Sequence, residues 1–145
     1  MTPLSDHFTL EELTHSSTAQ RLGIDNAPSP AIRANLMLLA RGLETVRLVT
    51  GHPLHIDSGY RCQALNRAVG GAEHSAHMDG WAADFTCPEF GTPAEIVAEV
   101  IRQKVSFDKI IQEGTWVHIS FDPARRGAVM TAHFGPQGTT YTEGV

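Results

Sequence analysis

Residues 75–84 read Ser-Ala-His-Met-Asp-Gly-Trp-Ala-Ala-Asp, and Trp116-Val117-His118 follows later in the chain. These two segments offer two imidazoles and one carboxylate, those of His77, Asp84 and His118. Three such ligands leave one position of a tetrahedral zinc ion free, and this open position distinguishes a catalytic zinc site from a closed structural one. If the three side chains meet, the sequence predicts a hydrolytic centre with one Zn²⁺ ion.

Alternation along two expected strands favours such a meeting. In residues 116–121 every second side chain is apolar, which puts His118 on the face opposite the core. In residues 82–86 the side chains of Asp84 and Phe85 point to opposite faces in the same way. Two neighbouring strands could therefore present Asp84 and His118 toward one cleft.

The loop before Asp84 contains Gly80, whose backbone freedom lets the chain turn His77 back toward that carboxylate. A lone histidine in a strand is more often a hydrogen-bonded structural residue than a ligand. A His-x6-Asp spacing also lacks the single-helix geometry that makes HExxH informative. The metal prediction therefore depends on the surrounding sequence as well as on the three residues.

Helix caps and apolar periodicity predict the other elements. Residues 1–27 read as an arm with short helical turns, the first at the capping-box spacing of Thr9 and Glu12. A helix of about 18 residues follows Pro30 and ends near Gly51. Its apolar stripe consists of Ile32, Leu36, Leu39, Leu43 and Val46. A second helix begins at Thr92-Pro93-Ala94-Glu95 and ends near Lys104.

The expected strands are short and cluster late in the chain, where short turns join them. This arrangement is typical of an α+β fold with a largely antiparallel sheet and flanking helices. We expect a single domain over residues 1–145, with the arm 1–27 packing on it and an irregular tail at 135–145. The strands are expected at residues 54–58, 82–86, 109–112, 116–121 and 128–134, with a short helix at 62–69.

Composition narrows the possible functions. The formal charge is −5 and the Lys and Arg residues are scattered, so we expect no nucleic-acid partner. No apolar run reaches the roughly 18–20 residues of a membrane span, and we expect no membrane insertion and a monomer. The first residues lack the basic and apolar regions of a signal peptide, which predicts synthesis in the cytoplasm. Cys62 and Cys87 are expected to be free thiols, with a single disulfide as the alternative.

The motif Ser75-x-His77-x-x-Gly80-x-Ala82-x-Asp84, followed by Trp116-Val-His118, resembles the M15 zinc peptidases, the D-Ala-D-Ala carboxypeptidase and phage endolysin group. The resemblance extends over nearly the whole chain. It implies the hedgehog/DD-peptidase fold, a zinc cofactor and peptidoglycan stem peptides as substrates. The other matching segments are Phe8-Thr-Leu-Glu-Glu-Leu13, Ser58-Gly-Tyr-Arg61, Leu65-Asn66, Val69-Gly-Gly71 and Ala132-His-Phe134.

The resemblance implies that His77, Asp84 and His118 are the zinc ligands and that Arg61 lies on the substrate side. A guanidinium there could polarise a carbonyl, hold a substrate carboxylate or stabilise an oxyanion. The alternatives are an ordinary surface arginine or an arginine paired with Asp57. Two more residues are expected to contact substrate. These are Ser75, which could instead orient a ligand or cap its turn, and Trp116, as part of a cleft wall.

The general base of this site departs from the family's pattern. The family usually has an Asp or Glu shortly before the last histidine, but the position three before His118 is Thr115, which cannot act as a base. Glu113 is the nearest carboxylate, and we predict that it is the base. The alternatives are that Glu113 is a plain turn carboxylate, or that Asp79 or Asp57 takes this role.

The sequence therefore predicts a zinc-dependent metallopeptidase that cuts peptidoglycan stem peptides, as a carboxypeptidase or as an endopeptidase. Without a signal peptide, such an enzyme is expected to reach the cell wall after release, as a phage or prophage endolysin does, or by another export route. One alternative is a non-catalytic zinc- or cell-wall-binding module with the same fold. Another is an enzyme that acts on a peptide from outside the wall.

Overall fold

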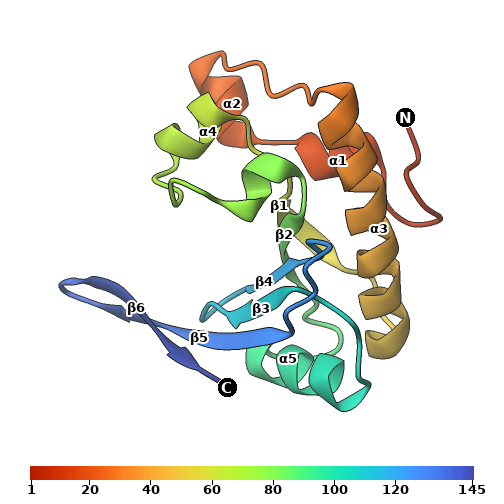
Figure 1. Cartoon of the computed structure of the whole chain (residues 1–145), viewed down its shortest axis with the longest axis vertical. Coiled ribbons are helices and arrows are strands. Elements are labelled where there is room, and N and C mark those ends of the chain that lie inside the picture. The colour runs from red at the N-terminus through yellow and green to blue at the C-terminus, as the bar shows by residue number, and fades with distance from the viewer.

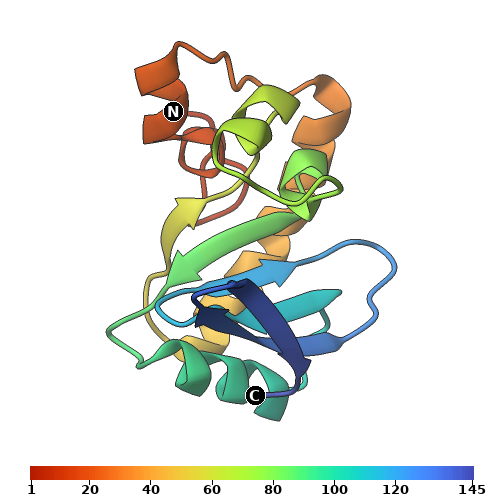
Figure 2. The same cartoon turned by 90° about the vertical axis from the view of Figure 1, so that its left-hand side faces the viewer.

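The centre of the molecule is a six-stranded sheet (Figures 1 and 2). The computed structural model describes all 145 residues. The strands are β1 (His55–Ser58), β2 (Ala82–Thr86), β3 (Lys109–Gln112), β4 (Val117–Ser120), β5 (Ala128–Gly135) and β6 (Gly138–Glu143). Their order is β1-β2-β4-β3-β5-β6, and every neighbouring pair is antiparallel except β3 and β5. The expected α+β class and largely antiparallel sheet are confirmed.

The helices begin and end where the sequence signals them. Ser29 caps α3 by accepting a hydrogen bond from the backbone of Ile32, and Gly51 ends the helix at φ 71°. Both halves of the capping box between Thr92 and Glu95 are formed at the start of α5. The helical elements are α1 (Leu10–Thr14), α2 (Ser17–Leu22), α3 (Pro30–Thr50), α4 (Gln63–Ala68), the 3₁₀ turn η1 (Ala76–Asp79) and α5 (Pro93–Arg102). None of these helices has the length and hydropathy that a membrane crossing requires.

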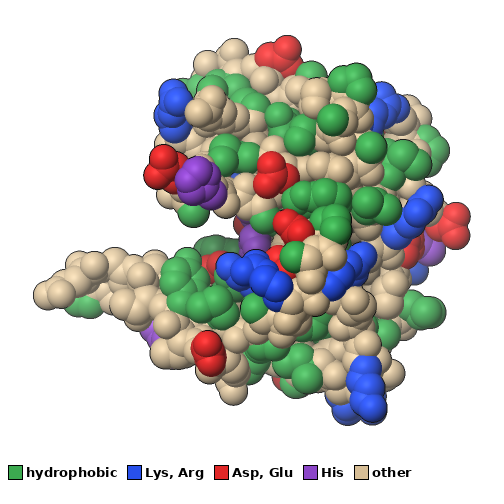
Figure 3. Space-filling model, in the orientation of Figure 1, with side chains coloured by type: hydrophobic (Ala, Val, Ile, Leu, Met, Phe, Trp, Pro, Cys, Tyr) green, Lys and Arg blue, Asp and Glu red, His purple; other side chains and the backbone are tan.

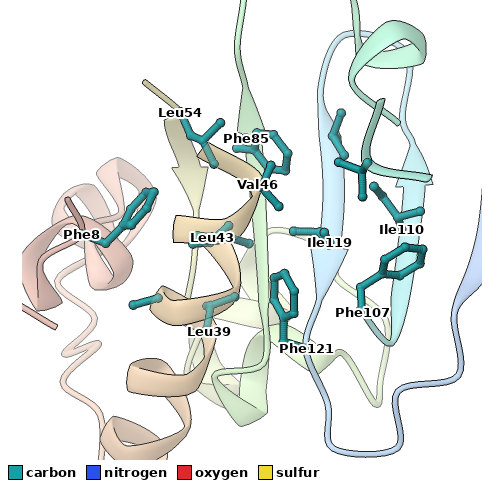
Figure 4. Close-up of a cluster of buried hydrophobic side chains, with 14 of the residues drawn as sticks. Phe8, Leu39, Leu43, Val46, Leu54, Phe85, Phe107, Ile110, Ile119 and Phe121 are labelled. Atoms are coloured by element: carbon teal, nitrogen blue, oxygen red, sulfur yellow. The ribbon is translucent and has the colours of Figure 1, made fainter. Parts of the chain in front are cut away.

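One face of the sheet packs on α3 and α5 and forms the core (Figure 4). The predicted apolar stripe of α3 is fully buried from Leu36 to Val46. From the sheet, Phe85, Val117 and Ile119 enter the same cluster with no exposed surface. The strand residues between them therefore point to the other face, as the alternation predicts. Cys62 and Cys87 are both free thiols.

The N-terminal arm is anchored beside the ligand-bearing part of the chain. Phe8 and Leu13 are buried in the common core. The backbone N–H of Tyr60 donates to the carbonyl of Leu13 at 2.7 Å. A Cβ on Gly59 would collide with that same carbonyl, so only glycine fits at this crossing. The arm thereby holds the chain immediately after β1.

The prediction of an irregular tail over residues 135–145 is wrong, because most of it forms strand β6. Pro136 and Gln137 make a two-residue turn, and Gly138 begins β6 at φ 108°. Every residue of β6 is exposed, so the strand has no apolar alternation by which a sequence pattern could reveal it. The β5–β6 hairpin projects from the body of the molecule (Figure 1).

Candidate metal centre

His77 is oriented by two backbone contacts. Ser75 caps η1, and its Oγ accepts from the backbone N–H of His77 at 3.2 Å. Gly80 ends the turn at φ 75°, the left-handed conformation that the sequence argument assigns to it. The side chain of His77 is only 2% exposed, and its Nδ1 lies 2.7 Å from the carbonyl oxygen of Gly59. A carbonyl can only accept, so Nδ1 carries the proton and Nε2 faces the site.

Asp84 and His118 come from adjacent strands and are direct partners in the β2–β4 register. Oδ1 of Asp84 lies 3.0 Å from Nδ1 of His118 and 3.2 Å from Nε2 of His77. The two imidazole rings meet edge to face, with centroids 5.1 Å apart. One potential ligand atom from each of the three residues lies within 4.8 Å of the other two. The structure therefore brings together the three residues that the sequence singles out.

The charges in this cluster favour a cation. Burial alone would raise the pKa of Asp84, but the hydrogen bonds from His118 and His77 outweigh it and hold the pKa below its ordinary value. The carboxylate is therefore ionised. Nε2 of His77 and Oδ1 of Asp84 lie 3.2 Å apart, and either a proton or a metal ion can lie between them. Two imidazoles with one carboxylate suit Zn²⁺.

A hollow separates the upper part of the molecule from the projecting hairpin (Figure 3). In Figure 3, histidine and carboxylate atoms are seen between the upper part of the molecule and the projecting hairpin. The upper part contains α1, α2, α4 and η1, and the lower part contains the sheet (Figure 1). The exposed fractions of the Asp84 and His118 side chains are 18% and 14%, so both remain reachable from solvent.

Arg61 lies beside this cluster, on the β1 side of the sheet. Its backbone N–H donates to the carbonyl of His77 at 3.1 Å, and its Nη2 is 3.4 Å from Oγ of Ser75. Its Nε is buried without a hydrogen-bond partner. Burial lowers the pKa of the guanidinium, and the charge of Asp84 opposes this shift. Arg61 forms no ion pair with Asp57, so the pairing considered from the sequence is absent.

Ser75 has a structural role that the geometry makes visible. It is 9% exposed, and its hydroxyl accepts from both the His77 backbone and the Arg61 guanidinium. The hydroxyl oxygen of Ser75 thus links the η1 turn, which carries His77, to Arg61.

Next to Arg61 is a cavity of about 380 Å³ that none of the three ligands lines. Asp57, Ser58, Tyr60 and the start of α2 form its other walls.

Glu113 occupies the turn between β3 and β4. Its backbone N–H donates to the carbonyl of Trp116 at 3.0 Å, and Gly114 takes φ 83° in the turn. Ile111 pairs with His118, and alternation puts Glu113, two residues further, on the same face as both. Burial raises the pKa of the Glu113 carboxylate. The nearby His118 lowers this pKa, and the charge of Asp84 raises it. Both ligands therefore lie within electrostatic reach of Glu113.

The other carboxylates considered as bases are arranged differently. Asp57 is exposed next to an irregularity in the β1–β2 register, and burial and the charge of Asp84 raise its pKa. Asp79 is the last residue of η1, and its carbonyl accepts from the Asn35 side chain at 2.8 Å. Neither lies on the strand pair that displays His118.

Two aromatic residues of the β5–β6 hairpin, Phe134 and Tyr141, were not predicted from the sequence as site residues. Phe134 of β5 contacts Trp116, with ring centroids 6.2 Å apart. Tyr141 lies on β6, opposite Ala132 of β5. The signal that could reveal Tyr141 is the Thr-Thr-Tyr-Thr run after Gly138, which has strand propensity but no apolar periodicity.

Comparison with known proteins agrees with this geometry. A protein-family model described as Peptidase M15 matches residues 6–120. The matched part contains His77, Asp84 and His118 as well as the whole of α3 and α5. It ends at the last residue of β4, so β5 and β6 lie beyond it. A search of curated proteins found no match.

Proposed function

Because this chain belongs to the peptidase M15 family, we propose that it is a zinc-dependent metallopeptidase that hydrolyses peptide bonds in peptidoglycan stem peptides. The observation that carries this proposal is the convergence of His77, Asp84 and His118 in a solvent-reachable hollow. Three protein ligands leave a coordination position open, as catalytic zinc sites require.

The chain supplies the ligand atoms in defined orientations. Nε2 of His77, a carboxylate oxygen of Asp84 and a ring nitrogen of His118 would hold the ion. Zn²⁺ at this position would polarise the scissile carbonyl and lower the pKa of water. The hydrogen bond from Nδ1 of His77 to the carbonyl oxygen of Gly59 stabilises His77 as a ligand, because it fixes the tautomer and the plane of the imidazole ring.

Glu113 is the proposed general base. It accepts a proton from the attacking water and returns it to the nitrogen of the leaving amine. Burial raises its pKa above the ordinary value, which makes the carboxylate a stronger proton acceptor once it is ionised. Gly114 takes φ 83° in the turn that follows Glu113, a conformation that favours glycine.

Arg61 is proposed to bind the substrate, either at a carboxylate or at the oxyanion that forms during the reaction. The positive charge of its guanidinium would stabilise negative charge that develops on the carbonyl oxygen. Ser75 fixes its orientation through the contact to Nη2. Trp116 is proposed to form part of the wall against which the substrate lies.

Stem peptides are proposed as the substrate class because of the family and the shape of the hollow. The hollow is open where the β5–β6 hairpin projects (Figure 3), which favours an endopeptidase that binds residues on both sides of the bond. The cavity beside Arg61 favours a carboxypeptidase that takes a terminal carboxylate. The second candidate function, a non-catalytic wall-binding module, has its support in the position of Glu113, five residues before His118 rather than three.

Digestion of purified peptidoglycan with mass analysis of the products tests this function. The zinc-loaded protein is expected to release fragments, and loss of terminal D-Ala would identify a carboxypeptidase while cut stems would identify an endopeptidase. His118→Ala is expected to release none. His52→Ala is the matched control, because His52 is an exposed histidine away from the site. Bound zinc without any product would contradict a peptidoglycan peptidase and favour the non-catalytic module or an enzyme that acts on another peptide.

A further inference from the structure

The β5–β6 hairpin extends the face of the sheet that carries the metal ligands. Partners in register share a face, so a single row links Asp84, His118, Ile111 and Met130 across four strands. Two positions further along, Ala132 of β5 pairs with Tyr141 of β6. Alternation therefore puts Tyr141 on the same face as the ligands.

The hairpin is fixed against the turn that holds Glu113. Phe134 contacts Trp116 at the end of this turn, with centroids 6.2 Å apart. A Cβ on Gly114 would lie 3.1 Å from the ring of Phe134, so the hairpin packs closely on the turn backbone. The position of Tyr141 relative to Glu113 is therefore set by packed contacts and by the β3–β5 pairing.

A small residue separates Glu113 from Tyr141. The β3–β5 register ends at Gln112 and Thr131, so Glu113 and Ala132 are the next residues along the two segments, and Ala132 pairs with Tyr141. Two strand spacings are about 10 Å. Ala132 is only 6% exposed although Phe134 and Tyr141 are 57% and 49% exposed, so its larger neighbours cover it. Glu113 and Tyr141 thus lie on either side of Ala132.

The hydroxyl of Tyr141 is available to a substrate. It makes no hydrogen bond to another residue, in contrast to His133 on the opposite face of the hairpin, which bonds Thr142 at 2.8 Å. Burial raises the pKa of Tyr141, and the charges of Glu113 and Asp84 raise it further. The phenol therefore keeps its proton at neutral pH and can donate it in a hydrogen bond.

We propose that Tyr141 is a substrate-positioning residue, whose hydroxyl donates to a backbone carbonyl of the substrate peptide on the Glu113 side of the site. Arg61 lies toward β1 and Tyr141 on β6, so the two contacts come from opposite edges of the sheet. A peptide held at both edges lies across the metal ligands between them. This inference rests on the proposed peptidase function. The hairpin also lies beyond the residues matched by the family model.

The proposal is tested with a synthetic stem pentapeptide that ends in D-Ala-D-Ala. Its binding and its turnover by the zinc-loaded protein are measured in separate experiments. Tyr141→Phe keeps the ring and removes only the hydroxyl. We expect KM and the dissociation constant to rise about five- to tenfold with kcat unchanged, as for the loss of one neutral hydrogen bond. Thr140→Ala is the control, because Thr140 is an exposed neighbour on the opposite face of β6.

The outcomes separate this inference from the proposed function. Turnover by the wild type with an unchanged KM in Tyr141→Phe would overturn the role of Tyr141 and leave the peptidase function standing. Binding without turnover would remove the peptidase function, while a weaker dissociation constant in Tyr141→Phe would still support the contact. If the wild type neither binds nor cleaves the peptide, both are overturned. Equal zinc content and melting temperature in the variants exclude a merely structural effect.

Discussion

Asp84 and His118 are direct cross-strand partners, with Oδ1 of Asp84 3.0 Å from Nδ1 of His118. The distance between these two candidate ligands is therefore set by the hydrogen-bonded ladder between β2 and β4. Only the third, His77, depends on a turn, and there the Gly59 carbonyl and the Ser75 cap restrict the imidazole. A centre supported in this way is expected to keep its geometry with and without an ion.

Replacement of His118 by alanine is expected to abolish stoichiometric zinc. The loss of a direct ligand should exceed the roughly 10- to 100-fold cost of losing an outer partner of a ligand. Zinc content after dialysis, measured by elemental analysis, is the test, with His52→Ala as the control. A full equivalent of zinc in His118→Ala would refute its assignment as a ligand.

Glu113→Gln is expected to lower kcat by about 10²- to 10⁴-fold while zinc stays bound, because the amide cannot accept the proton of the attacking water. Steady-state kinetics on a stem peptide, with zinc content measured in parallel, give the result. Glu143→Gln changes an exposed carboxylate of β6 and serves as the control. Wild-type turnover at full zinc occupancy would assign the base to another group.

The same substitution is expected to stabilise the metal-free protein at pH 7. Burial raises the folded-state pKa of Glu113 above the ordinary 4.5, so ionisation disfavours folding once the pH exceeds that raised pKa. Below the unfolded value of 4.5 the carboxyl is protonated in both states and the cost disappears. Denaturant unfolding of the EDTA-treated wild type and Glu113→Gln at pH 7 and pH 4 should therefore show a gain only at pH 7. An equal gain at both pH values would contradict this explanation.

Gly59→Ala is expected to weaken metal binding without touching a ligand. The added Cβ would collide with the Leu13 carbonyl and displace the backbone whose oxygen accepts from His77. We expect zinc affinity to fall about 10- to 100-fold and the free energy of unfolding to fall by about 1–3 kcal/mol. Chelator competition and thermal unfolding measure the two effects. Gly135→Ala is the control, because its nearest neighbouring atom would lie 3.8 Å away and its φ is not positive.

Much of the candidate site could be predicted from local patterns. The capping box of Thr92 and Glu95 marks the start of α5 because it satisfies backbone donors within one turn. Alternation separates Asp84 and His118 from the core because a strand has period two. These features need no knowledge of distant residues, and the structure agrees with each of them.

The sequence by itself determined which side chains are candidate ligands, which face of each strand carries them and where the main helices begin. Only the tertiary structure decided that Asp84 faces His118, that Gly59 fixes His77, and that the parallel pairing of β3 with β5 brings Tyr141 to the Glu113 side. These relationships depend on pairings between distant segments, whose register local propensity does not encode. Strand β6 was not predicted for a related reason. All of its residues are exposed, so its pairing with β5 requires no alternation of apolar and polar residues.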